Sequence, residues 1–401
     1  MSLENLLTLP NAAFEEGHKY LYQKALRGVA KIPVISKMLP SITKALNESS
    51  YDLPNNNSIM LPQVEKLIAD NLLFLPDNLF LRASPYHIDR WTRDAFYTCL
   101  AINDAAFQIH LLSKTLHRNR RYPQAPTTRL FDTDREWYFD DESTAISIIW
   151  RAKIAQEGIP VLREERSDWQ DRLGWLTKHS EDGSYVTPAG TERSWYDTFI
   201  FPEPDVIKYN QGIYTASLIA AERLGLTLPK GELKNATAAY NSLNNSEGRL
   251  SFSRNFNYKD ASSLTGEFLA NRLFNVSLLD PGTTLATIRT LDPVPGGYKV
   301  VSDENGQPLN PNQFNQHCLP GDYHNWANWP LFSGIARYTG EKHGLPTDQI
   351  FWQELYNILR ISRGAEYART SGDLIELNWN RQRENHAWNA LAYTLIAELS
   401  G

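Results

Sequence analysis

Residues 91–117 read WTRDAFYTCLAINDAAFQIHLLSKTLH, and this stretch shows how the chain is organised. Its apolar side chains recur every three or four positions, which is the spacing that places them on one face of a helix. These positions are Phe96, Leu100, Phe107, Leu111 and Leu112. The pattern predicts one long amphipathic helix over residues 91–117.

Helical periodicity continues through most of the sequence, whereas alternating, strand-like runs are few. Gly225 and Gly340 stand where glycines commonly end helices. A small hairpin with an Asn-Gly turn is expected at 298–308. Further helices are expected near 13–30, 61–73, 141–157, 166–179, 208–225, 230–244, 262–275, 324–340, 346–361 and 385–398.

About a dozen helices joined by loops rich in Pro, Gly, Asn and Asp predict an all-α fold. Such a chain suits a double ring, in which an outer layer of helices wraps an inner one. Helix packing rules alone leave an irregular all-α domain equally open. No repeat of fixed period is visible, so a solenoid is not expected.

The charge and cysteine content argue against several classes of protein. The formal net charge is −6, and nucleic-acid binding would need a basic stripe. Cys99 and Cys318 are the only cysteines, too few for a disulfide framework or a metal ligand set, so we expect a cytoplasmic protein. The N-terminus has no signal-peptide pattern, and no apolar run approaches the ~18 residues of a membrane span. Motifs for phosphate, dinucleotide or zinc binding are missing too, so we expect no metal or cofactor.

Aromatic residues are abundant, with 11 Trp, 19 Tyr and 16 Phe in 401 residues. Sugar-binding proteins use aromatic faces because the C–H groups of a pyranose pack against a π system. Large helical cores are also rich in aromatic residues, so composition alone does not decide between the two explanations.

Carboxylates and aromatics gather in segments that read as loops or helix starts, where functional residues usually lie. The segments are YHIDRWTRDAF (86–96), REWYFDDES (135–143), RSWYDTF (193–199), GDYHNWANWPLF (321–332), DLIELNW (373–379) and ENHAWNAL (384–391).

These segments could supply the two carboxyl groups that glycosidic hydrolysis needs, one protonated and one ionised. Asp197 follows Trp195 and Tyr196, and an apolar surrounding suits an acid because desolvation disfavours the charged form. On local chemistry, Glu376 and Glu384 are both candidates for the base.

Each candidate also has a simpler structural explanation. Asp197 could cap a helix, which is a common use of Asp. Asp94 could be a helix-start charge with Arg93 as its surface partner. His324 and His386 could be structural histidines held by hydrogen bonds.

Taken in order, four stretches resemble the amylo-α-1,6-glucosidase domain of glycogen debranching enzymes, and more loosely glucoamylases and processing α-glucosidases. RWTRDAF is similar to that family's Trp-Gly-Arg-Asp helix start, and SWYDTF to its Thr-Trp-Met-Asp-Ala motif followed by a helix, here YNQGIYTASLIAAERLG. YHNWANWP is similar to Tyr-His-x-Gly-x-Val-Trp-Pro. DLIELNW and ENHAWNAL are similar to the closing Pro-Glu-Leu and Gln-Ala-Trp-Ser pair.

The resemblance implies an (α/α)6 barrel and an inverting glycoside hydrolase. On this basis we expect residues 1–401 to form one such barrel domain, with an N-terminal helical extension of about 1–80 packed on it. Asp197 would be the general acid and Glu376 the general base, with Glu384 as the second choice. Arg93 and Asp94 would hold sugar hydroxyls, and the pocket wall would include Tyr323, His324 and Trp329. The other substrate-binding candidates are Trp91, Asp141, Trp195, Tyr196, Asn210, Trp326, Trp379 and Glu384.

The chain departs from the family motifs at several positions. Ser194 replaces Thr, Tyr196 replaces Met, Ile375 replaces Pro, and Trp326 stands where the Tyr-His motif has Gly. No β-rich domain like that of debranching enzymes precedes the helices, so a small or short-chain glycoside is the expected substrate.

Two alternatives from other classes remain open at this stage. One is a sugar isomerase or epimerase on the same kind of barrel, in which His324 or His386 would move the proton. The other is an inactive carbohydrate-binding protein.

Overall fold

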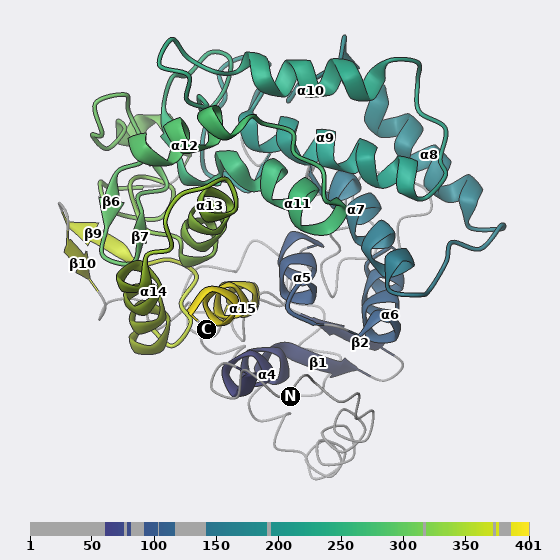
Figure 1. The fold of residues 1–401 in the computed structure, drawn as a ribbon, viewed down its shortest axis with the longest axis horizontal. Helices are drawn as coiled ribbons and strands as arrows, with labels where there is room; N and C mark the ends of the chain where they lie inside the picture. Colours follow the sequence, from purple (N-terminus) through teal and green to yellow (C-terminus); the bar gives the residue numbers. More distant parts are fainter. Residues whose placement is uncertain are drawn as a thin grey trace, which may run out of the picture. The chain divides into compact units, whose positions relative to one another are not determined.

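The computed structural model describes residues 61–75, 78–81, 92–102, 104–116, 142–190, 194–315, 318–371, 374–376 and 386–400. Twelve α-helices lie in these ranges (Figure 1). They are α4 (Leu61–Asn71), α5 (Thr92–Cys99), α6 (Ala105–Leu116), α7 (Ser143–Gln156), α8 (Arg166–Thr177), α9 (Lys208–Arg223), α10 (Glu232–Ser242), α11 (Thr265–Phe274), α12 (Pro281–Thr290), α13 (Pro330–Lys342), α14 (Gln349–Ile361) and α15 (Asn389–Ser400).

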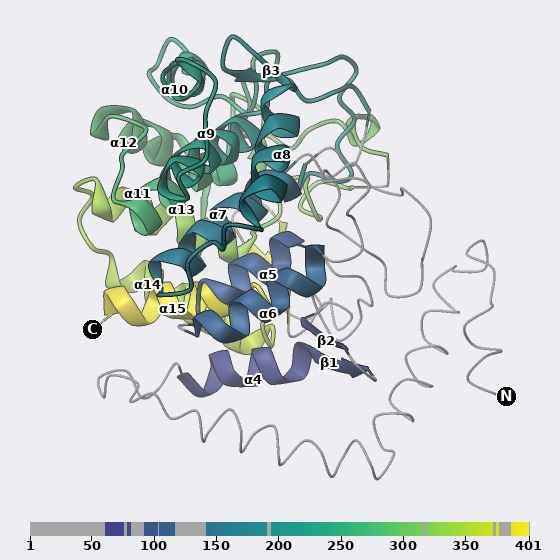
Figure 2. The same ribbon diagram turned by 90° about the vertical axis from the view of Figure 1, so that its right-hand side faces the viewer.

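Every second helix belongs to an inner ring. The helices α5, α7, α9, α11, α13 and α15 each pack against the next, and α15 packs against α5, so the ring closes (Figure 1). The other six lie outside them, for example α6 and α8 on α7, α10 on α9, and α4 on α15 (Figure 2). Six inner and six outer helices in alternation form an (α/α)6 barrel, which confirms the predicted fold class.

The inner helices α9 and α11 approach each other closely at Gly212 and Gly266. A Cβ atom on Gly266 would lie 2.3 Å from the Cα atom of Gly212, closer than real Cβ atoms come to a neighbour. Only glycine permits this backbone contact. The crossing holds α9 and the loop before it in a fixed place.

Strands are short and occur only as five antiparallel pairs among the described residues. The pairs are β1 (Leu72–Leu75) with β2 (Asn78–Leu81), β3 (Ser180–Glu181) with β4 (Ser184–Tyr185), β5 (Lys259–Asp260) with β8 (Val301–Ser302), β6 (Pro293–Val294) with β7 (Gly297–Tyr298), and β9 (Arg369–Ser371) with β10 (Leu374–Glu376). Two short 3-10 helices, η2 (Ala261–Leu264) and η3 (Pro311–Gln313), complete the set.

The prediction of one helix over 91–117 is wrong, because the chain turns between α5 and α6. Asp104 begins the second helix, since its Oδ1 accepts the backbone N–H of Phe107 at 2.9 Å. Apolar periodicity continues through the turn because α5 and α6 both pack against α7. One helix of the pair belongs to the inner layer and the other to the outer layer.

Three further predictions about element boundaries need correction. The helix expected at 324–340 begins only at Pro330, a residue suited to the first helical position. Gly340 lies inside α13, which continues to Lys342, and a Cβ there would meet the Ile288 side chain at 2.3 Å. Helix α12 is not among the expected helices, although Asp280 caps it by accepting the Thr283 N–H at 2.9 Å.

The hairpin expected at 298–308 is also wrong, since β7 pairs with β6 and β8 pairs with β5. Its Asn-Gly turn does form, with Gly306 at a φ of +79° and its N–H bonded to the Asp303 carbonyl. Gly225 follows α9 with a φ of +69°, as expected of a glycine that ends a helix.

The predicted extension over about 1–80 falls largely outside the described residues, so the division into one barrel and an extension stays a prediction. Among the described helices, none is both long enough and apolar enough to cross a membrane. Cys99 and Cys318 are both buried free thiols.

Candidate active site

The acidic segment 194–199 forms a turn ahead of α9. The Tyr196 carbonyl accepts the backbone N–H of Phe199 at 3.1 Å, and α9 begins only at Lys208. Asp197 therefore does not cap a helix, and that alternative explanation of the residue is wrong. The loop after it is held by backbone pairing of Phe201 with Gly190.

Asp197 lies against two side chains from the loop that precedes α13. Its Oδ2 is 3.4 Å from the Tyr323 hydroxyl, and its Oδ1 is 3.5 Å from the Nδ1 of His324. Thr198 contacts the same His324 nitrogen at 2.8 Å. His324 is fully buried, whereas 36% of the Asp197 side chain remains exposed. The Asp197 carboxylate is thus held by Tyr323 and His324, while part of its side chain remains open to solvent.

The wall behind Asp197 is aromatic. The Trp195 ring lies 5.0 Å from His324, 4.9 Å from Trp329 and 4.1 Å from Phe332, measured between centroids. Only 1% of Trp195 is exposed and none of Tyr196. Two of the predicted sugar-binding residues therefore lie beneath the loop surface, where they hold Asp197 in place.

A buried carboxylate, Asp260, supports this wall from below. The Trp195 indole N–H and the Tyr196 hydroxyl both contact the Oγ of Ser262, at 3.0 and 2.5 Å. Ser262 in turn donates from its backbone N–H and its Oγ to Asp260, at 2.8 and 2.9 Å. Burial raises the pKa of Asp260 to about 6, although these hydrogen bonds oppose the shift.

A second polar cluster contains the predicted pair Arg93 and Asp94 at the start of α5. Arg93 forms an ion pair with Glu142 and lies 3.8 Å from the Asp94 carboxylate. The Nε2 of His386 is 3.5 Å from both Asp94 and Glu366. All five side chains are buried. Asp94 does lie in the first turn of α5, but the alternative of a surface partner for it is wrong.

Aromatic rings join the two groups. Trp329 lies 5.6 Å from Trp388, and the Arg93 guanidinium lies 5.8 Å from the Trp388 ring. The indole N–H of Trp388 is buried and has no hydrogen-bond partner among the residues that the structure describes. Segments far apart in the sequence thus meet along one wall, which we call the aromatic wall (Trp195, Trp329, Phe332 and Trp388).

The other predicted residues have different surroundings. Asn210 on α9 is buried and donates to the Thr187 hydroxyl at 3.0 Å. Trp326 lines a separate pocket together with Lys299. Glu376 lies in β10, paired with Arg369 of β9, and its side chain falls outside the described part of the structure. The candidates Trp91, Asp141, Trp379 and Glu384 also lie outside the described residues.

The sequence interpretation missed Glu142, Asp260, Glu366 and Trp388 as parts of this site. Glu142 directly follows the predicted Asp141, and Trp388 lies in a quoted segment, so both could have been found. Asp260 precedes Ala-Ser-Ser, which is typical of a helix cap, and it does cap η2. No local signal distinguishes Glu366 from a surface glutamate.

In the described ranges, no three or more His, Cys, Asp or Glu side chains are placed so that they could hold a metal ion.

The alternation of inner and outer helices defines the architectural class, a six-hairpin barrel. No protein-family model matches the sequence, and no curated protein matches it either.

Solved structures match this fold. A wild-type glycosidase aligns with a TM-score of 0.57 and 14% identity, covering 86% of this chain and 96% of its own. A variant glycosidase in complex with glucose gives the same values. The glucoamylase of Hormoconis resinae aligns at 0.55 with 11% identity, covering 86% of this chain and 74% of its own. At these identities the likeness establishes the glucoamylase-like (α/α)6 fold.

Proposed function

We propose that this protein is a glycoside hydrolase, specifically an exo-acting, inverting α-glycosidase of the amylo-α-1,6-glucosidase and glucoamylase type. One observation carries the proposal. The Asp197 carboxylate is held by Tyr323 and His324 over a buried aromatic wall, yet more than a third of its side chain is exposed. A general acid needs this combination of fixed position and access to the leaving oxygen.

In the proposed mechanism, Asp197 donates a proton to the glycosidic oxygen as the bond to the anomeric carbon breaks. A water molecule attacks that carbon from the opposite face, and Glu376 accepts the proton of the water. One proton enters the leaving group and one leaves the water, so the reaction is balanced. In an inverting enzyme the two carboxyl groups stand ~6.5–9.5 Å apart, against ~5–5.5 Å in a retaining one.

The buried cluster at α5 would hold the sugar ring that is cleaved. Arg93 and Asp94 supply donors and acceptors for hydroxyl groups, and the contacts of Arg93 with Glu142 and of Asp94 with His386 keep them oriented. The matched glycosidase in complex with glucose supports a hexose as the ligand class. We propose a small or short-chain α-glucoside as the substrate.

The stereochemistry of the product tests the proposal. Proton NMR of wild-type protein with maltose, isomaltose and an aryl α-glucoside should show β-glucose as the first product. Release of α-glucose would show retention and would remove Glu376 from the base role. Absence of hydrolysis across these glucosides and the matching α-mannosides would reject the glycosidase proposal.

The position of His386 between two carboxylates keeps the isomerase alternative testable. A histidine flanked by acids can shuttle a proton next to a carbonyl. Incubating free hexoses in D2O separates the two functions, because isomerisation incorporates deuterium into carbon and hydrolysis does not. Calorimetric sugar binding without turnover of any glycoside would instead indicate an inactive binding protein.

A further inference from the structure

Trp326 adopts a backbone conformation that tryptophan rarely takes. Its φ is +77°, in the left-handed region that favours glycine. The similar motif of debranching enzymes has Gly at this position, which such a conformation would suit. This chain places its bulkiest possible side chain there, so the surrounding structure must hold the strained residue in place.

Three contacts hold Trp326. Its indole N–H donates to the Gly306 carbonyl at 3.1 Å, and its own carbonyl accepts the Thr370 hydroxyl at 2.7 Å. The ammonium of Lys299 lies 3.5 Å from the centre of the ring. One hydrogen bond therefore holds the indole, another holds the backbone carbonyl, and a cation lies on one face of the ring.

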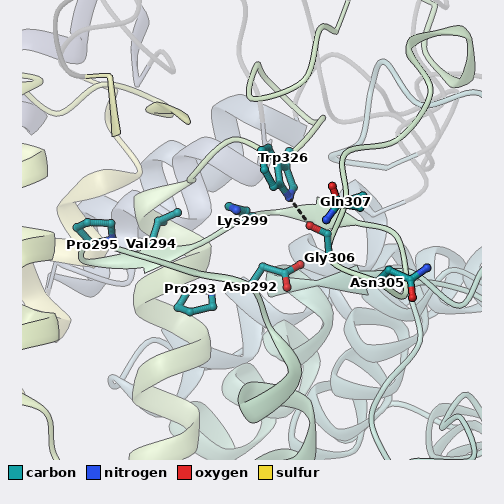
Figure 3. A pocket seen from close by; sticks show the side chains of 9 residues that line it. All are labelled: Asp292, Pro293, Val294, Pro295, Lys299, Asn305, Gly306, Gln307 and Trp326. Atoms are coloured by element: carbon teal, nitrogen blue, oxygen red, sulfur yellow. Dashed lines mark hydrogen bonds between the residues drawn. The ribbon is translucent and has the colours of Figure 1, made fainter. Parts of the chain in front are cut away.

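The fixed ring lines a pocket of about 590 Å³ (Figure 3). This volume lies within the range of small-molecule sites, ~300–1,000 Å³. Figure 3 shows Trp326 above Lys299, with Gln307 beside Trp326, and with Pro293, Asp292 and Asn305 at the lower side of the pocket. We call this the Trp326 pocket.

The lining of the Trp326 pocket is suited to a saccharide. An indole ring and a proline supply apolar contact for C–H groups, and the amides of Asn305 and Gln307 supply donors and acceptors for hydroxyls. Asp292 in the same lining forms an ion pair with Lys259 at 2.9 Å and accepts the Ser302 hydroxyl. The lining itself holds one acidic side chain, Asp292, and one basic side chain, Lys299, so its formal charges balance and it does not select for a phosphate.

One loop connects this pocket to the candidate acid. Residues 321–329 carry Tyr323 and His324 to Asp197, and three positions later they carry Trp326 into the pocket. We propose that the Trp326 pocket is a second carbohydrate-binding site, which takes a neutral hexose unit other than the one cleaved at Asp197. This inference rests on the proposed function, and it deepens it by making oligosaccharides the preferred ligands.

The test measures equilibrium binding in the full chain with the Asp197→Asn substitution, so that ligands persist. Glucose, maltotriose, isomaltose and mannobiose are titrated by calorimetry. Adding Trp326→Gly should weaken maltotriose binding roughly tenfold, while the affinity for glucose should change much less. Trp326→Phe keeps a stacking face and should recover most of the loss. The control Trp175→Phe, on α8, should leave binding unchanged.

Unchanged oligosaccharide binding in folded Trp326→Gly protein would overturn the inference, and so would no binding of any of these sugars. Lys299→Met provides a second variant, which keeps a side chain of similar length and removes the ammonium group. It should also weaken maltotriose binding if the pocket is occupied. Trp326-dependent binding together with no hydrolysis by the wild type would support the pocket and reject the glycosidase proposal. Hydrolysis by the wild type together with sugar binding that does not depend on Trp326 would support the glycosidase proposal and reject the second binding site.

Discussion

The two sides of loop 321–329 are built differently. On the acid side, Tyr323 and His324 lie against Asp197 and are backed by buried rings, with His324 itself fully buried. On the pocket side, Trp326 stands beside amides and paired charges in an open pocket. Both sides contain a non-glycine residue with positive φ, +44° at Tyr323 and +77° at Trp326. Tyr323 and His324 keep the first two residues of the Tyr-His motif that the loop resembles, whereas Trp326 departs from it. We therefore expect that mutations can separate chemistry from ligand preference.

The largest expected effect lies on the acid side. Asp197→Asn and Glu376→Gln should each lower kcat on an aryl α-glucoside by about 10²–10⁴-fold, because each removes a proton transfer. KM should change little, which steady-state kinetics can establish. The control Asp182→Asn alters an exposed turn between β3 and β4 and should leave kcat unchanged. Full activity in either site variant would remove that residue from the mechanism.

A smaller effect should come from Asp260, beneath the acid side. Its pKa is raised from 3.8 to about 6 in the folded protein, so between these values the folded state binds more protons than the unfolded state. The stability that Asp260 contributes is therefore present at low pH and is lost as the pH rises through about 6. Over this window the loss should reach about 3 kcal/mol.

Urea unfolding at a series of pH values checks this prediction. The quantity to follow is the free energy of unfolding of the wild type minus that of Asp260→Asn. It should fall between about pH 4 and pH 6 and stay constant above about pH 6. A difference that does not vary with pH would contradict the raised pKa. Maltotriose binding at the Trp326 pocket should be nearly the same in both proteins if the two sides are independent.

The smallest expected effect concerns the backbone on the pocket side. Trp326→Gly should be more stable than Trp326→Ala by about 1 kcal/mol, because only glycine takes a positive φ without strain. Gln353, exposed on α14, provides the matched control. There the order should reverse, with Gln353→Ala more stable than Gln353→Gly by about 1 kcal/mol. Equal stability of both Trp326 variants in urea unfolding would contradict the left-handed conformation.

The motif resemblance implied the barrel. Helical periodicity predicted the all-α class, because it survives wherever a helix packs on a neighbour. For the same reason it failed at residues 91–117, where α5 and α6 both pack on α7 and the turn leaves the apolar pattern intact. The order of the motifs predicted that Asp197, Tyr323 and His324 belong to one site. In the structure, Tyr323 and His324 both lie against the Asp197 carboxylate.

The remaining site features depend on tertiary contacts that have no local signature. Glu366 follows α14 and becomes part of the site only because the barrel brings it to His386. Trp326 was predicted to bind substrate, but its left-handed conformation is held by Thr370 at the backbone and by Gly306 at the indole, and both residues are distant in sequence. Side-chain propensities alone would place tryptophan elsewhere.

The central claim is that Asp197 acts as the general acid, and the leaving group provides the most direct test. Fluoride departs from α-glucosyl fluoride without being protonated by an acid, whereas the alkoxide of a disaccharide does not. The kcat of Asp197→Asn should therefore be close to that of the wild type on α-glucosyl fluoride, and about 10²–10⁴-fold lower on maltose or isomaltose. An equal loss on both substrates, or no loss on either, would contradict the account.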